Sequence, residues 1–103
     1  EDIRTPYEIL IAEILLQKTK AEKVHPVYIN FLKKIPSPKH LIDASNEQLK
    51  EMLNTLGLQN RRVKTLKDVA EYLENFKEID AKAIEGLEDI TGIGKYIINA
   101  IKK

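Results

Sequence analysis

The stretch Asp89–Ile101, DITGIGKYIINAI, holds two of the chain's four glycines one residue apart, and an apolar run follows them almost at once. The residues before it, AKAIEGLED, are typical of one short helix, and KYIINAIKK is typical of another. Glycine permits backbone conformations that other residues avoid, while the apolar Ile93 between Gly92 and Gly94 can anchor the turn in a core. The pattern predicts a tight helical hairpin over residues 81–103.

The start of the second hairpin helix is a candidate anion site. The backbone N–H groups of Gly94, Lys95 and Tyr96 begin that helix without intrahelical acceptors, and such groups are a natural seat for a phosphate. On spacing alone, a purely structural corner between two helices explains the glycines equally well. Both interpretations stay open at this point.

Helix-start signals recur along the first third of the chain. Thr5-Pro6-Tyr7-Glu8 combines an N-cap, a proline at the first helical position and a Glu at the third, which predicts a helix over Pro6–Lys18. Thr19-Lys20-Ala21-Glu22 is a second capping box and predicts another helix directly after the first. Pro26 lies about two turns beyond that cap, so we expect it to kink this helix or to delay its regular part.

Similar signals divide the rest of the chain. Ser37-Pro38 predicts a short helix to about Asp43, and Ser45-Asn46-Glu47-Gln48 is a capping box that opens the next helix. Gly57 should end that helix, after which NRRVKTLKDVAEYLENF restarts with one apolar face. No stretch alternates apolar and polar residues as strands do. We therefore predict an all-α fold, a compact bundle of six to seven short helices that forms a single domain over residues 1–103.

Composition limits the classes of function. The 103 residues are 43% hydrophobic, which suffices for one compact domain, and the formal net charge is only +1, so any nucleic-acid site must be local. The chain has no cysteine, which excludes disulfides, a thiol nucleophile and a cysteine-bound metal or iron–sulfur cluster within these residues. His25 and His40 have no partner at a metal-ligand spacing. We recognise no membrane span or signal peptide and expect an intracellular protein, cytoplasmic or nucleoid-associated.

Three segments, in order, resemble the helix-hairpin-helix superfamily of DNA repair glycosylases, which includes endonuclease III, the adenine glycosylases and the thymine mismatch glycosylases. The family's hairpin reads Leu-Pro-Gly-Val-Gly, and the matching positions here are Ile90, Thr91, Gly92, Ile93 and Gly94, with Thr91 in place of the usual proline. Pro6–Thr19 resembles the family's first barrel helix, and Leu56–Leu66 resembles its glycine-containing middle segment. The resemblance implies a six-helix barrel domain that binds double-stranded DNA.

The resemblance also implies roles for the first helix. Glu13 shares a helical face with Ile9 and Leu16 on spacing, and in the family a Glu or its counterpart at this place faces the flipped base and acts on the base or its leaving group. Gln17 and Lys18 match residues that enter the gap left by the extruded nucleotide. The alternatives are a Glu13 whose stem packs while its carboxylate reaches solvent, and a solvated, frayed helix end.

Tyr96 occupies the position at which lyase members of the family carry the Lys that forms a Schiff base. A phenol cannot form an imine, so the resemblance implies a monofunctional glycosylase that releases a base through water; the alternative is an amphipathic core residue. By position in the motif, the resemblance implies that the hairpin contacts DNA through Gly92, Ile93, Gly94 and Lys95. The monovalent cation that the family holds at this turn would bind the backbone carbonyls of Glu88, Ile90 and Ile93.

The family's catalytic Asp and its cluster-binding cysteines come later than the position of Lys103. We therefore expect a DNA glycosylase domain that acts on a mismatched or damaged base and is catalytically incomplete as it stands. No cofactor is expected in these residues, and an iron–sulfur cluster only if the protein continues. The alternative is a non-catalytic helix-hairpin-helix module that grips DNA backbone or a protein partner.

Overall fold

The computed structural model describes residues 5–90 and 92–102, apart from the side chains of residues 95, 96 and 102. All regular structure in this part of the chain is helical, which confirms the predicted fold class. The helices are α1 (Pro6–Leu16), α2 (Ala21–Lys34), α3 (Pro38–Asp43), α4 (Asn46–Met52), α5 (Gln59–Leu73), α6 (Ala81–Gly86) and α7 (Lys95–Lys102). Two 3-10 turns, η1 (Asn54–Leu56) and η2 (Leu87–Asp89), complete the described elements.

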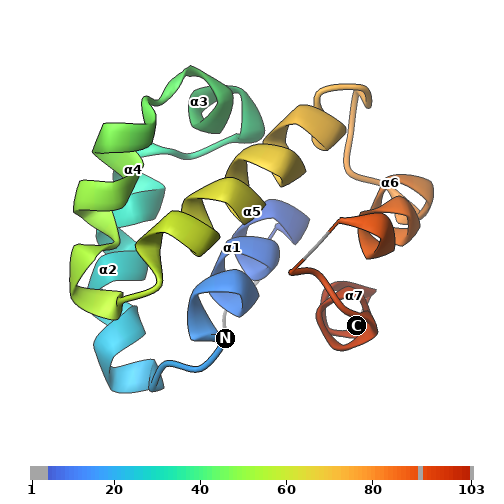
Figure 1. Ribbon diagram of the computed structural model, residues 1–103. Helices are drawn as coiled ribbons and strands as arrows, with labels where there is room; N and C mark the ends of the chain where they lie inside the picture. The colour runs from blue at the N-terminus through green and yellow to red at the C-terminus, as the bar shows by residue number, and fades with distance from the viewer. Residues whose placement is uncertain (1–4, 91, 103) are drawn as a thin grey trace.

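Helices α1 and α5 form the centre of the fold. They contact each other, α1 also packs against α2 and α7, and α5 packs against α3 and α4. Figure 1 shows α2, α3 and α4 on one side of this central pair and the α6–α7 hairpin on the other. The large, fully buried side chains come from both groups and from the centre, and they include Phe31, Leu10, Ile11, Ile14, Leu15, Leu66 and Leu87. Burial of such apolar side chains is the main favourable term in folding.

Three of the predicted helix starts are confirmed in atomic detail. The Thr5 hydroxyl accepts the Glu8 N–H at 3.1 Å, and the Glu8 carboxylate accepts the Thr5 N–H at 2.9 Å, which is a complete capping box. Ser37 and Ser45 accept backbone N–H groups at the starts of α3 and α4. These caps fix where each chain segment enters its helix.

The predicted capping box at Thr19 is wrong. Helix α2 begins at Ala21 after Lys20, which makes no side-chain cap, because the Thr19 hydroxyl is engaged elsewhere. It accepts a hydrogen bond from Nη2 of Arg62 at 2.6 Å and donates to the Gln17 carbonyl at 3.3 Å. Helix α1 also ends earlier than predicted, at Leu16, so that Gln17–Thr19 form a loop rather than a last helical turn.

Pro26 was expected either to kink α2 or to delay its regular part, and the second expectation is wrong. The helix runs from Ala21 to Lys34 with Pro26 inside it. Pro26 and Glu22, whose carbonyl loses its helical partner there, are both exposed, so water can replace the missing donor. Gly57 has a φ of +74° and ends the segment after α4 as predicted, with the turn η1 inserted before it.

The hairpin is attached to the centre of the fold through Tyr72. Its hydroxyl donates to the Ala83 carbonyl of α6 at 2.8 Å. An ideal Cβ on Gly86 would lie 1.9 Å from the Tyr72 hydroxyl oxygen. Glycine at position 86 therefore lets α6 approach α5 closely. Burial, with the charges of Asp89 and Asp80, raises the pKa of the Tyr72 phenol.

Candidate functional site at the hairpin and the end of α1

The glycine turn packs directly on the central helix α5. Gly92 has a φ of +100°, and an ideal Cβ there would lie 2.6 Å from the Thr65 hydroxyl oxygen. Ile93 is buried, and its N–H donates to the Ile90 carbonyl at 3.0 Å. The Gly94 carbonyl accepts the N–H groups of Ile97 and Ile98 and so begins α7. These contacts confirm the predicted hairpin with Ile93 anchored in the core, while Thr91 lies outside the described residues.

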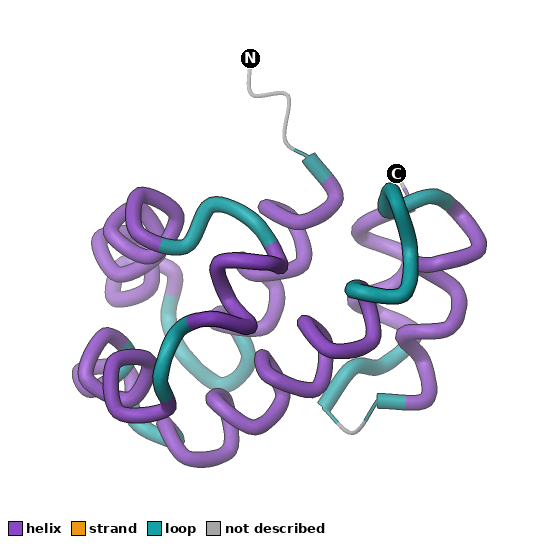
Figure 2. Tube along the Cα trace, turned by 90° about the horizontal axis from the view of Figure 1, so that it is seen from above, coloured by secondary structure: helices purple, strands orange, loops and turns teal. Residues whose placement is uncertain are grey.

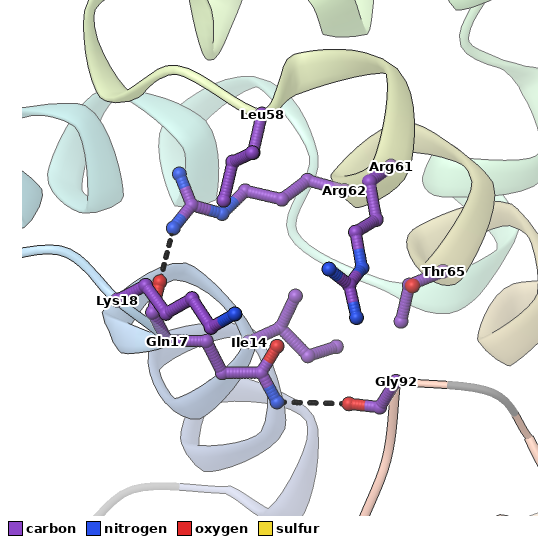
Figure 3. Close-up of a pocket in the computed structure, with 8 residues that line it drawn as sticks. All are labelled: Ile14, Gln17, Lys18, Leu58, Arg61, Arg62, Thr65 and Gly92. Atoms are coloured by element: carbon purple, nitrogen blue, oxygen red, sulfur yellow. Dashed lines mark hydrogen bonds between the residues drawn. The ribbon is translucent and has the colours of Figure 1, made fainter.

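Gln17 connects the end of α1 to this turn. Its side-chain Nε2 donates to the Gly92 carbonyl at 2.8 Å, across 75 positions of sequence. Figure 3 shows this bond, with the Gln17 amide between the α1 end and the hairpin. The two segments that the family resemblance singled out are thus joined in the fold. Gln17 is exposed, so its amide remains accessible to a ligand.

A cleft of about 400 Å³ lies beside Gln17, and we name it the arginine cleft. It is lined by Ile14, Gln17, Lys18, Leu58, Arg61, Arg62, Thr65 and Gly92. Figure 3 shows side chains from α1, α5 and the hairpin around it. Three lining residues are cations and none is a carboxylate, so the cleft attracts anions even though the whole chain is nearly neutral.

Two rim residues of the arginine cleft have unusual backbone conformations. Lys18 has a φ of +57° and Leu58 a φ of +52°, and both side chains are exposed. Leu58 is 50% exposed, so much of this apolar side chain is available for contact with a ligand. Sequence reasoning missed Leu58, Arg61 and Arg62 individually. The available signal was the Arg61-Arg62 pair placed just after a helix-ending glycine.

A second cleft, of about 280 Å³, holds Glu13, and we name it the Glu13 cleft. Its other lining residues are Leu16, Gln17, Gly94 and Ile97, so Gln17 lines both clefts. Glu13 is half-buried, as are Ile9 and Leu16, the two residues of the apolar face expected from spacing, which pack against the core. Among the described residues no hydrogen bond or ion pair to Glu13 is present.

The structure brings several of the predicted site residues together. Glu13, Gln17, Lys18, Gly92 and Gly94 all line one of these two adjoining clefts. Ile93 is buried in the turn between the helices, and the side chains of Lys95 and Tyr96 lie outside the described part of the chain. The proposed roles of all these residues stay predictions.

The expected cation site consists of backbone atoms. Ile90 and Ile93 are placed on the turn after η2, and the Ile90 carbonyl keeps one lone pair beside its bond from the Ile93 N–H. The Glu88 carbonyl belongs to η2. A monovalent cation on these three carbonyls stays a prediction. Among the described residues no cluster of His, Asp or Glu side chains could hold a metal.

Replacing Glu13 with Gln tests whether this carboxylate has a structural partner. Because Glu13 is half-buried and no described residue pairs with it, we expect Glu13→Gln to be neutral or to stabilise the fold, by at most about 1 kcal/mol at neutral pH. Thermal unfolding of the variant and the parent from mildly acidic to mildly basic pH measures the difference. A clear loss of stability at neutral pH would return Glu13 to a structural role.

Comparison with known proteins places this fold and hairpin among the domains of base-excision DNA repair. Residues 11–100 match the family described as HhH-GPD superfamily base excision DNA repair protein. That match covers most of the chain, and the chain therefore belongs to the HhH-GPD superfamily. No described helix has the length and apolar character needed to span a membrane.

The relatives are DNA glycosylases. The chain is 34% identical to the thymine-DNA glycosylase of Aeropyrum pernix over 93% of its own length and 44% of the relative's. It is 33% identical to the thymine/uracil-DNA glycosylase of Pyrobaculum aerophilum, with 93% and 42% covered. A solved structure of a thermostable thymine-DNA glycosylase superposes with a TM-score of 0.82 at 31% identity, over 96% of this chain and 46% of that one. The chain thus spans less than half the length of these relatives.

Proposed function

We propose that this domain binds duplex DNA at a mismatched or damaged base pair and receives the extruded base beside Glu13. The observation that carries the proposal is the position of Gln17, which lines both the Glu13 cleft and the arginine cleft. A side chain between two clefts can occupy the space of a nucleotide that has left the stack. The extruded base then enters one cleft while the opposite strand lies along the other.

The charges of the arginine cleft support DNA as the ligand. Lys18 and Arg61 are exposed on its rim, and no carboxylate lines it. Lysine and arginine side chains neutralise backbone phosphates and release counterions, which supplies affinity without sequence preference. The exposed N-terminus of α7 at Gly94 adds backbone N–H donors at the hairpin. Binding should therefore show little preference for DNA sequence, and the affinity should fall as the salt concentration rises.

Leu58 supplies an apolar wedge on the opposite rim. Apolar side chains that project from a DNA-binding surface enter between base pairs and unstack them. Leu58 directly precedes α5, is 50% exposed and lines the arginine cleft together with Lys18. Its burial against a base would offset part of the unstacking cost. We propose that Gln17 and Leu58 enter the duplex from its two strands.

Glu13 is the group that would act on the extruded base. A carboxylate in a small cleft with apolar walls can transfer a proton or stabilise the positive charge that develops on the sugar as the glycosidic bond breaks. For the whole protein we propose release of thymine or uracil from mismatched pairs, because relatives at 34% and 33% identity bear those names. We also propose that a monovalent cation on the carbonyls of Glu88, Ile90 and Ile93 strengthens phosphate binding at the hairpin.

Fluorescence anisotropy with three labelled duplexes of one sequence tests the proposal. One duplex is fully paired, one carries a G·T mismatch, and one carries a stable abasic-site analogue. Because the abasic duplex has no base to unstack at the gap, we expect it to bind about tenfold more tightly than the paired duplex. Equal affinity for all three duplexes would contradict base extrusion and favour the non-catalytic module. No measurable binding at low salt would refute the proposed function.

A further inference from the structure

Arg62 joins two loops that lie far apart in the sequence. Its side chain is only 3% exposed. Nη1 donates to the carbonyls of Leu56 at 3.2 Å and Gly57 at 3.0 Å, in the loop before α5. Nη2 donates to the Gln17 carbonyl and to the Thr19 hydroxyl at 2.6 Å, in the loop after α1. One guanidinium therefore holds both loops at a fixed separation.

The atoms that Arg62 binds are next to the two strained residues of the cleft rim. Lys18 lies between Gln17 and Thr19, and Leu58 directly follows Gly57. Among the described residues only Lys18 and Leu58 combine a side chain with a positive φ. Such conformations persist only where the surroundings enforce them, and strain of this kind gathers at functional sites. The Arg62 bonds lie directly beside both residues, one set on each side of the cleft.

Burying the charge of Arg62 between the two loops costs free energy of desolvation. All four of its acceptors are neutral oxygens, and the ion pair that the structure records in the described part of the chain is Lys64–Asp68. Burial accordingly lowers the pKa of the Arg62 guanidinium. The Arg62 bonds satisfy three backbone carbonyls and one hydroxyl, which an apolar side chain would leave without these donors. The rigid fork of donors of arginine, which lysine lacks, fixes geometry.

We propose that Arg62 is a positioning residue for recognition of interrupted duplexes: it holds the tips Lys18 and Leu58 at the separation that a duplex with a displaced base requires. The inference rests on the proposed function. A preformed pair of tips lowers the ordering cost of binding at the gap. Phosphate contacts from other cations do not depend on that separation. Arg62 thus affects the preference for a gap more than binding to duplex in general.

Arg62→Met, with Lys67→Met as matched control, tests the proposal. Lys67 lies on the same helix and also donates to backbone carbonyls, those of Leu41, Ile42 and Ala44, but these belong to the end of α3. We expect Arg62→Met to lose most of the about tenfold preference for the abasic duplex while the salt dependence of paired-duplex binding stays unchanged. Lys67→Met should keep both. NMR Cα and Cβ shifts of Lys18 and Leu58 should leave the left-handed range only in Arg62→Met.

Three outcomes would overturn this inference. In the first, the Cα and Cβ shifts of Lys18 and Leu58 stay in the left-handed range in Arg62→Met. In the second, these shifts change but the preference for the abasic duplex remains. In the third, Lys67→Met loses that preference as fully as Arg62→Met does. Thr19→Val provides a milder variant if Arg62→Met does not fold, since it removes one acceptor and keeps the guanidinium. It should reduce the preference in the same direction, and an unchanged preference counts against the proposal. If the parent chain itself binds neither duplex, the proposed function fails instead.

Discussion

Reversing the charges of Lys18 and Arg61 together, in Lys18→Glu/Arg61→Glu, is expected to weaken binding to the abasic duplex by about a hundredfold near 0.1 M salt. Both side chains are exposed on the rim of the arginine cleft, where each can reach one phosphate. Their loss removes two counterion-releasing contacts and adds two repulsive charges. The slope of log affinity against log salt should fall by about two. Anisotropy titrations at four or five salt concentrations measure both quantities.

Lys39→Glu/Lys77→Glu is the matched control, because it changes the net charge of the chain by the same amount. Lys39 and Lys77 are exposed and line a different cleft, between α3 and the end of α5. If affinity depends on the local charge of the arginine cleft, the control should lose far less than the test variant. Equal losses in the two variants would show that only net charge matters and would remove the cleft from the DNA-binding surface.

The sequence predicted those features whose causes are local. The caps at Thr5, Ser37 and Ser45 each satisfy an N–H three residues away, so a short motif is enough to place them. The hairpin followed from Gly92 and Gly94 with the apolar Ile93 between them, a pattern also confined to a few residues. Local chemistry therefore predicted the fold class and most helix starts.

The errors and omissions have long-range causes. Thr19 carries the right residue type for an N-cap, but Arg62 binds its hydroxyl across 43 positions and removes it from that role. No propensity predicts the positive φ of Lys18 or Leu58, the two residues beside the loop atoms that Arg62 binds. The arginine cleft could not be predicted either, because its walls come from α1, α5 and the hairpin.

Separate substitution of the two hairpin glycines should distinguish their roles. Gly92→Ala places a Cβ 2.6 Å from the Thr65 hydroxyl oxygen and 3.2 Å from its Cγ2, at a φ of +100°. Overpacking and backbone strain together should destabilise the fold by about 2–4 kcal/mol. In a domain of this size that lowers the Tm by about 10 °C or more, which calorimetry measures. Any loss of DNA binding in this variant would then report the fold rather than a contact.

Gly94→Ala tests the contribution of the hairpin to DNA binding, because this variant should keep its fold. Among the described residues, chain neighbours aside, no atom lies within 4 Å of the added Cβ. The exposed glycine precedes the first residue of α7, so the cost in stability should stay below about 1 kcal/mol. If a phosphate sits on the N–H groups that start α7, the methyl group crowds it, and duplex affinity should fall about threefold to tenfold. Unchanged affinity in this folded variant would mean that the hairpin is a structural corner.

Thr65→Ala combined with Gly92→Ala removes the two atoms of Thr65 that lie closest to the added Cβ of residue 92. The strained φ of residue 92 is then the main remaining cost in stability. The double variant should therefore recover part of the stability lost in Gly92→Ala, and the coupling between the two positions should exceed about 1 kcal/mol. No recovery would mean that φ strain, not the approach of the turn to α5, requires glycine at position 92. Strong recovery would show that α5 positions the hairpin by direct contact at Thr65, beside the cleft that Arg61 and Leu58 line.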